Sequence, residues 1–273
     1  MSQVGLLYLT LVVVSAASGL VGLMSWRWRA KLWLRRLSAL GGWSCTALAL
    51  STWGLRWYQA GHLPLLGTYE SALALCVVIL CAALILEQLS HSEAGVLPVA
   101  CLLTSAAALH GMGFDAAAHS LPIYARSWAV QLHAVVAWSA FGVLALNAGL
   151  ALRCVVLDAT ERQSRWLARS LHWGFVLHSA MMVSGALSQL LLRGRAWSFD
   201  PVESLGMVAW LSYGALMHLH LRGGWSGRRL AWWCLLLFLV LVVSYRGIVS
   251  LPPGSTYHVF EPELNLGETP APP

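Results

Sequence analysis

Four histidines fall where they can share one end of the molecule. His62, His119 and His133 lie in or beside two short stretches between long apolar segments, and His258 lies in the C-terminal tail. Two neutral imidazoles that face each other can ligate a metal such as haem iron. Aromatic rings can support a flat macrocycle, and arginine can pair with its carboxylates. A lone histidine near the end of an apolar segment is more often a partner of the backbone or of polar headgroups, so these positions alone do not define a site.

A third short stretch, RGRAWSFDPVES at 193–204, adds aromatic and acidic side chains. Most of the 15 tryptophans lie at the ends of apolar segments, where indole rings favour a boundary between apolar and polar surroundings. Trp197 differs, because Phe199 and Asp200 follow it directly in a loop. This loop is therefore a candidate platform for a flat ligand.

Two further histidines, His178 and His218, lie inside apolar segments. An ionisable side chain within a membrane span is costly to bury, and it is therefore treated first as a functional residue. His218 falls near one end of its segment.

The elements that must position these residues follow from composition. The chain has 273 residues, of which 58% are hydrophobic and 10% are charged, and its mean hydropathy is +0.68. Soluble domains carry about 25% charged residues, so the lipid bilayer is the expected solvent. A spanning helix needs about 20 apolar residues. The sequence predicts an all-α polytopic transmembrane bundle with about eight spans, in one domain over residues 1–250 followed by a tail over 251–273. The predicted spans cover residues 4–24, 38–57, 69–89, 95–113, 129–151, 171–192, 203–221 and 230–249.

The distribution of basic residues predicts the orientation. They gather in alternate gaps, near residues 27–36, 153–169 and 222–229, and these gaps are expected to be cytoplasmic. Both termini and the loops near 58–68, 114–128 and 193–202 are then extracytoplasmic. The net charge of +6 is attributed to this bias and to anionic lipid rather than to nucleic acid. The six cysteines form no C-x-x-C pair and are expected to be buried thiols.

Several segments resemble the cytochrome c assembly family that carries a tryptophan-rich "WWD" loop, and most closely its CcsA (ResC) branch. The resemblance rests on GHLPLLGTYESALAL (61–75), SWAVQLHAVVAWSAF (127–141), the loop at 193–204, WLSYGALMHLHLRGGWSG (210–227) and SYRGIVSLPPGSTYHVF (244–260). The WWD loop is degenerate, since Arg193 and Phe199 stand where the family pattern has tryptophan. Gly67 and Thr68 replace the usual asparagine before Tyr-Glu-Ser.

The resemblance implies a haem site. By position, His133 and His258 match the two outer histidines that ligate haem iron, and His218 matches a transmembrane histidine that meets haem on its way out. Trp197, Phe199 and Asp200 match the loop that cradles the macrocycle. His178 has no counterpart in the family pattern.

The resemblance also implies a function, a location and partners. The expected protein is a subunit of a holocytochrome c synthase (haem lyase) in the bacterial cytoplasmic membrane, which holds haem b at the extracytoplasmic face for attachment to the C-x-x-C-H motif of apocytochrome c. A CcsB (ResB)-like membrane protein is the expected partner. The alternative is a non-catalytic HemX-like protein of haem homeostasis or regulation, which the degenerate loop favours. A CcmC-like protein that hands haem to a carrier is disfavoured by the Asp-Pro-x-Glu sequence at 200–203.

Overall fold

The computed structural model describes residues 3–27, 32–91, 94–117, 121–157 and 159–249. Within these ranges every regular element is helical, as the apolar segments predict. The elements are α1 (Gln3–Arg27), α2 (Leu32–Ala60), α3 (Thr68–Leu89), α4 (Leu97–Gly111), the short 3-10 helix η1 (Ile123–Arg126), α5 (Trp128–Val156), α6 (Glu161–Arg193), α7 (Pro201–Gly223) and α8 (Gly227–Val249).

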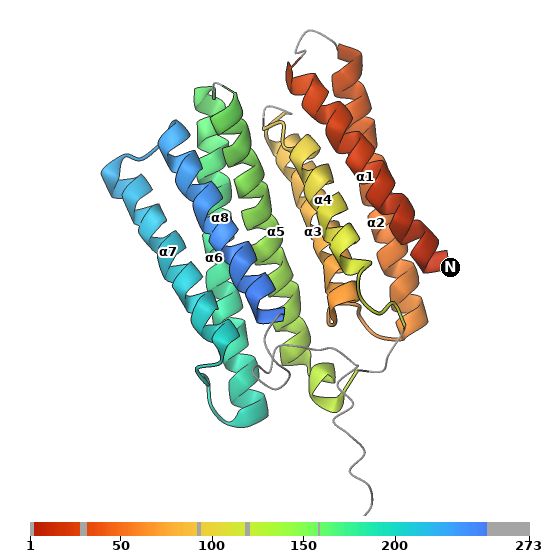
Figure 1. The fold of residues 1–273 in the computed structure, drawn as a ribbon. Coiled ribbons are helices and arrows are strands. Elements are labelled where there is room, and N and C mark those ends of the chain that lie inside the picture. Colours follow the sequence, from red (N-terminus) through yellow and green to blue (C-terminus); the bar gives the residue numbers. More distant parts are fainter. Residues whose placement is uncertain (1–2, 28–31, 92–93, 118–120, 158, 250–273) are drawn as a thin grey trace, which may run out of the picture.

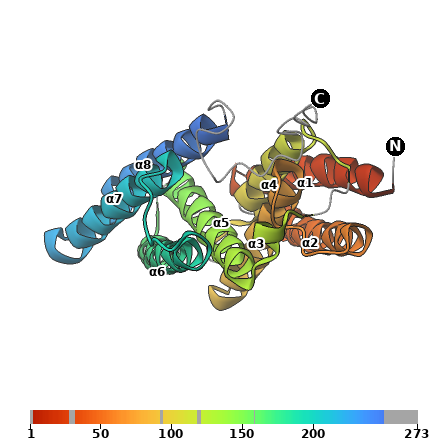
Figure 2. The same ribbon diagram turned by 90° about the horizontal axis from the view of Figure 1, so that it is seen from below.

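The long helices form two groups that meet at α3 and α5 (Figures 1 and 2). In the first group α1 packs on α2 and α4, and α4 packs on α3. In the second group α5 packs on α6 and α8, and α7 packs on both α6 and α8. The main apolar core runs between the groups, from α3 and α4 through α5 to α8.

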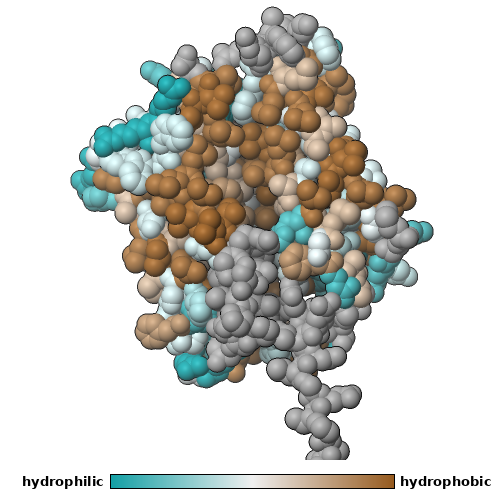
Figure 3. All heavy atoms as spheres, in the orientation of Figure 1, coloured by the Kyte–Doolittle hydropathy of each residue, from teal (hydrophilic) through white to brown (hydrophobic). Residues whose placement is uncertain are grey.

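Among the described residues, five helices are long and apolar enough to cross a membrane, namely α1, α3, α5, α6 and α8. The helix α4 has 15 residues and is shorter than a full span, whereas α2 and α7 carry arginine or histidine near their ends. Large apolar side chains cover the surface between the helix ends (Figure 3). Such a surface suits lipid rather than water, so the chain is a membrane protein.

The helix α6 begins ten residues before the predicted span that starts at residue 171. Thr160 caps it, since its hydroxyl accepts a hydrogen bond from the Gln163 amide while the Gln163 side chain bonds to the Thr160 amide. This capping box stabilises a polar first segment that hydropathy does not mark as a helix.

Hydrogen bonds from two helices show at which end of the bundle two of the connecting segments lie. At one end Arg56 of α2 donates to the carbonyls of Ala116 and Ala117, each at 2.7 Å. At the opposite end Arg153 of α5 donates to the carbonyl of Ala94 at 2.7 Å. The segment around Ala94 therefore lies at the same end of the bundle as the basic gap after α5.

Candidate functional site

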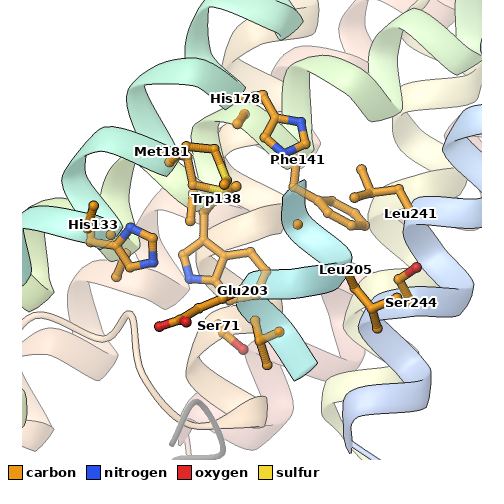
Figure 4. Close-up of a pocket in the computed structure, with 18 of the residues that line it drawn as sticks. Ser71, His133, Trp138, Phe141, His178, Met181, Glu203, Leu205, Leu241 and Ser244 are labelled. Atoms are coloured by element: carbon orange, nitrogen blue, oxygen red, sulfur yellow. The ribbon is translucent and has the colours of Figure 1, made fainter. Parts of the chain in front are cut away.

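A cavity of about 260 Å³ lies at the end of the bundle where α5, α6, α7 and α8 meet the start of α3 (Figure 4). We call it the central pocket. Its lining combines aromatic rings, thioethers and two imidazoles, contributed chiefly by Trp138, Phe141, Met181, Met182, Trp197, His133 and His178. Flat, apolar walls with a few polar atoms are typical of cofactor sites.

His133, in the second turn of α5, contacts α6 across the pocket wall. Its Nδ1 lies 3.3 Å from the Ser184 hydroxyl oxygen. Ser184 donates its own hydroxyl hydrogen to the carbonyl of Met181 at 3.0 Å, so its oxygen is an acceptor for the imidazole. The arrangement is compatible with a ring proton on Nδ1 and a lone pair on Nε2, which is the tautomer that ligates a metal through Nε2.

The loop before α7 is held by one carboxylate. Glu203 accepts hydrogen bonds from the amide of Ser198 at 2.8 Å, from its hydroxyl at 3.0 Å and from the amide of Asp200 at 3.4 Å. These bonds flank Phe199, whose φ of 58° is strained for a bulky residue. The clamp fixes the turn that places Trp197 against the central pocket.

A second framework holds the loop before α3, which forms another wall of the pocket. The Trp53 and Trp138 indoles donate to the carbonyls of Pro64 and Leu65, at 3.1 and 3.0 Å. Arg56 Nε also forms an ion pair with Glu70 Oε1 at 2.9 Å. The Arg56 and Glu70 side chains are only 4% and 7% exposed. The buried pair joins α2, α3 and the 112–117 segment at this end of the bundle.

Comparison with known proteins identifies the family of the chain. The model of the cytochrome C assembly protein family matches residues 65–255, which include the walls of the central pocket. The chain belongs to the cytochrome c assembly protein family. The match begins at residue 65, after α1 and α2.

Its relatives place the chain in the CcsA-type branch of the cytochrome c assembly family. A protein named "Cytochrome c biogenesis protein CcsA" from Prochlorococcus marinus (strain MIT 9303) is 27% identical over 245 residues, which cover 73% of this chain and 77% of that protein. The protein of the same name from Guillardia theta is 25% identical over 252 residues, with 78% and 83% covered. The chain is thus a cytochrome c biogenesis protein of the CcsA type.

The fold is also shared with a solved structure, "Cytochrome c Heme Lyase CcmF", at a TM-score of 0.66 and 15% identity. The similarity covers 93% of this chain but 48% of that protein, so the chain spans about half its length. At this identity the likeness concerns the arrangement of helices.

Of the residues that the family resemblance singles out, the structure brings His133 and Trp197 together at the central pocket. Asp200 is buried and caps α7, accepting a hydrogen bond from the Val202 amide at 2.8 Å. Phe199 is 83% exposed and stacks edge-on with Trp197 at 6.4 Å between ring centroids. His218 is exposed on α7, away from the buried face of that helix. His258, like His119, lies outside the described residues.

His178 is the pocket residue to which the family pattern assigns no role. It lines the central pocket from α6, on the same helical face as Gly185 and Gln189, which follow it by 7 and 11 residues. This spacing is one that a helix repeats on one side. Together with the cost of an imidazole within a span, it is the signal in the sequence that could have located His178 at the site.

A close contact at Gly185 makes the position of His133 testable. A Cβ atom at residue 185 would lie 3.0 Å from Cε1 and 3.3 Å from Nδ1 of the His133 ring. We expect Gly185→Val to displace the imidazole and to lower haem affinity by about tenfold or more, as loss of support around a metal ligand does. Gly185→Ala should have a smaller effect in the same direction.

The measurement is haem titration of the purified variants in detergent. Gly206→Ala is the matched control, because a Cβ atom there would meet Met182 Sδ at 3.8 Å, an ordinary contact in the same pocket. Equal haem affinity in Gly185→Val and Gly206→Ala would show that the contact between α6 and His133 does not matter for binding.

Proposed function

We propose that this chain is the haem-handling subunit of a cytochrome c haem lyase, and that its central pocket holds haem b for attachment to the C-x-x-C-H thiols of apocytochrome c. The observation that carries the proposal is the position of the His133 imidazole at the edge of a pocket walled by Trp138, Phe141 and Trp197. These are an axial ligand and flat partners for a porphyrin.

The pocket residues fit haem in a further respect. Among the described residues, both ring nitrogens of His178 and the Oε1 atom of Gln189 are buried without a hydrogen-bond partner. Buried polar atoms of this kind usually have partners, so a ligand that supplies them is expected. When bound, haem supplies the vinyl groups that react with the cysteine thiols of apocytochrome c. The chain's own residues hold and orient it, with His258 proposed as the second outer iron ligand.

The route of haem and the partner are proposed from His218. Its side chain is exposed on α7, within the apolar part of the bundle and remote from the buried face formed by Ala209, Tyr213 and Leu216. An imidazole on the lipid-facing side of a helix is accessible to a second membrane protein. We propose that a CcsB-like partner packs there and adds the second ligand for haem on its way to the central pocket.

The orientation follows from the positive-inside rule. It puts the central pocket, with the loops 61–67 and 194–200, at the extracytoplasmic face of a bacterial cytoplasmic membrane. Apocytochrome c is expected to approach from that side.

A HemX-like role in haem homeostasis is the second candidate. Phe199 is exposed, and an exposed arginine, Arg193, stands where the family pattern has a tryptophan. Of the two aromatic residues in this loop, Trp197 lines the pocket. This arrangement favours the HemX-like role. A loop with one wall residue can hold haem without presenting it for attachment.

Complementation separates the two candidates. We expect the chain, expressed with its CcsB-like partner in a bacterium that lacks its own CcsA-type protein, to restore covalent haem staining of cytochrome c. His133→Ala should abolish the staining, and His91→Asn should not, because His91 is an exposed residue at the opposite end with a φ of 50° that asparagine tolerates. Haem bound by the purified wild type without any cytochrome c maturation would favour the HemX-like role.

A further inference from the structure

His178 is a buried imidazole of the central pocket to which the proposed function gives no specific role. His178 is 2% exposed. Neither Nδ1 nor Nε2 makes a hydrogen bond of ordinary length and angle among the described residues, and the backbone group that acts on the ring is that of Gly206 in α7. Leaving a buried polar group without a hydrogen bond destabilises the folded protein. A residue with this cost is expected to serve a ligand.

The surroundings of His178 define what that ligand can be. Its imidazole meets the Tyr213 ring edge-on at 6.2 Å between centroids. Figure 4 shows the ring at the upper end of the central pocket, close to Phe141, with Met181 on the side toward His133. The site offers a neutral nitrogen ligand among aromatic and thioether groups, which suits a metal in a flat apolar macrocycle better than a charged or sugar-like solute.

The depth of His178 separates it from His133. The His133 ring packs against Gly185, which follows His178 by seven residues in α6. At 1.5 Å per residue, the two imidazoles are offset by about 10 Å along the helix. They therefore occupy two depths of one cavity, with His178 farther into the bundle.

We propose that His178 is an additional ligand for the iron of a metalloporphyrin, which it holds at an inner position of the central pocket below His133. The proposal rests on the proposed function, since it assumes that the pocket binds haem. It adds a binding residue at a second depth, so that the iron has an imidazole within reach before and after it arrives at His133.

The test uses His178→Leu, which fills similar space without a ligand atom or an unsatisfied polar group. We expect the purified full-length variant to retain several-fold less haem than wild type and to lose one low-spin component of the ferric electron paramagnetic resonance spectrum. We also expect its haem-free form to unfold at a higher temperature than haem-free wild type, because the unsatisfied imidazole is gone. His178→Met, which offers a thioether to iron, should restore haem content with an altered spectrum.

Tyr213→Phe is the matched control. The Tyr213 hydroxyl is also buried without a partner among the described residues, and its ring contacts His178. The variant should keep wild-type haem content and spectrum.

Two results would overturn the inference. In the first, His178→Leu keeps the haem content and spectrum of wild type while His133→Ala loses haem, which leaves the proposed function intact. In the second, haem-free His178→Leu is less stable than wild type and Tyr213→Phe loses haem equally, which indicates a packing role. If wild type itself takes up no haem, the proposed function fails as well.

Discussion

His133→Ala is expected to lower the haem content of the purified protein by more than tenfold. Even the loss of a group that merely orients a metal ligand costs about 10- to 100-fold in metal affinity, and here the ligand itself is removed. The remaining pocket still offers Trp138, Phe141 and Trp197 as apolar walls, so weak, high-spin haem binding should persist. The measurement is the molar ratio of haem to protein, together with the position of the Soret band.

The fold should survive this change, because His133 is only half-buried at the pocket edge. The thermal unfolding midpoint of the haem-free variant serves as the control for folding. If His133→Ala retains full haem content with an unchanged Soret band, its assignment as an iron ligand is wrong.

Glu70→Ala is expected to destabilise the protein by about 3–5 kcal/mol, the range found when one partner of a buried ion pair is removed. Arg56 would keep its bonds to the carbonyls of Ala116 and Ala117 but would carry an uncompensated charge in a site only 4% exposed. Because the same framework supports the loop before α3, haem binding should weaken as well. Thermal or chemical unfolding in detergent measures the first effect, and haem titration measures the second.

The matched control is Glu161→Ala. Glu161 pairs with Arg165 at 3.7 Å on the exposed start of α6, where both side chains are open to solvent. Exposed pairs of this kind contribute little, so the unfolding midpoint should stay at the wild-type value. Equal loss of stability in Glu70→Ala and Glu161→Ala would contradict the role given to the buried pair.

Eight α-helices of the described residues overlap the eight predicted apolar segments, and five of them are long and apolar enough to cross a bilayer. Their ends could not be predicted as well. The first ten residues of α6 are polar, and they are helical through the capping box of Thr160 and Gln163. Hydropathy reports where a helix enters lipid rather than where its hydrogen bonds begin.

The sequence named candidate site residues, and the structure shows where the described ones lie. His133 and Trp197 both line the central pocket, and their roles toward haem stay predictions, whereas Asp200 caps α7. The local sequence predicts this capping role, because Asp200 is followed by Pro201 and then by Glu203, a pattern that is typical of the start of a helix. The role of Asp200 in holding haem stays a prediction, as does that of His258, which lies outside the described residues.

The sequence does not predict the direction in which the His178 side chain points. Its position inside an apolar segment marks it as costly, but its direction depends on how α6 is rotated against α5 and α7. That rotation is set by close packing, such as Gly174 against Leu144 and Gly185 against His133. Such contacts join residues about 30 to 50 positions apart, and local pattern does not contain them.

The most direct test of the central claim, that the His133 imidazole ligates haem iron in this pocket, is chemical rescue of His133→Gly by free imidazole. The truncated side chain leaves space for an imidazole molecule at the pocket edge, beside Ser184 and Gly185. We predict that the variant shows a high-spin absorption spectrum and that added imidazole restores the low-spin spectrum of wild type at saturation. A wild-type spectrum in His133→Gly before any imidazole is added would contradict the account.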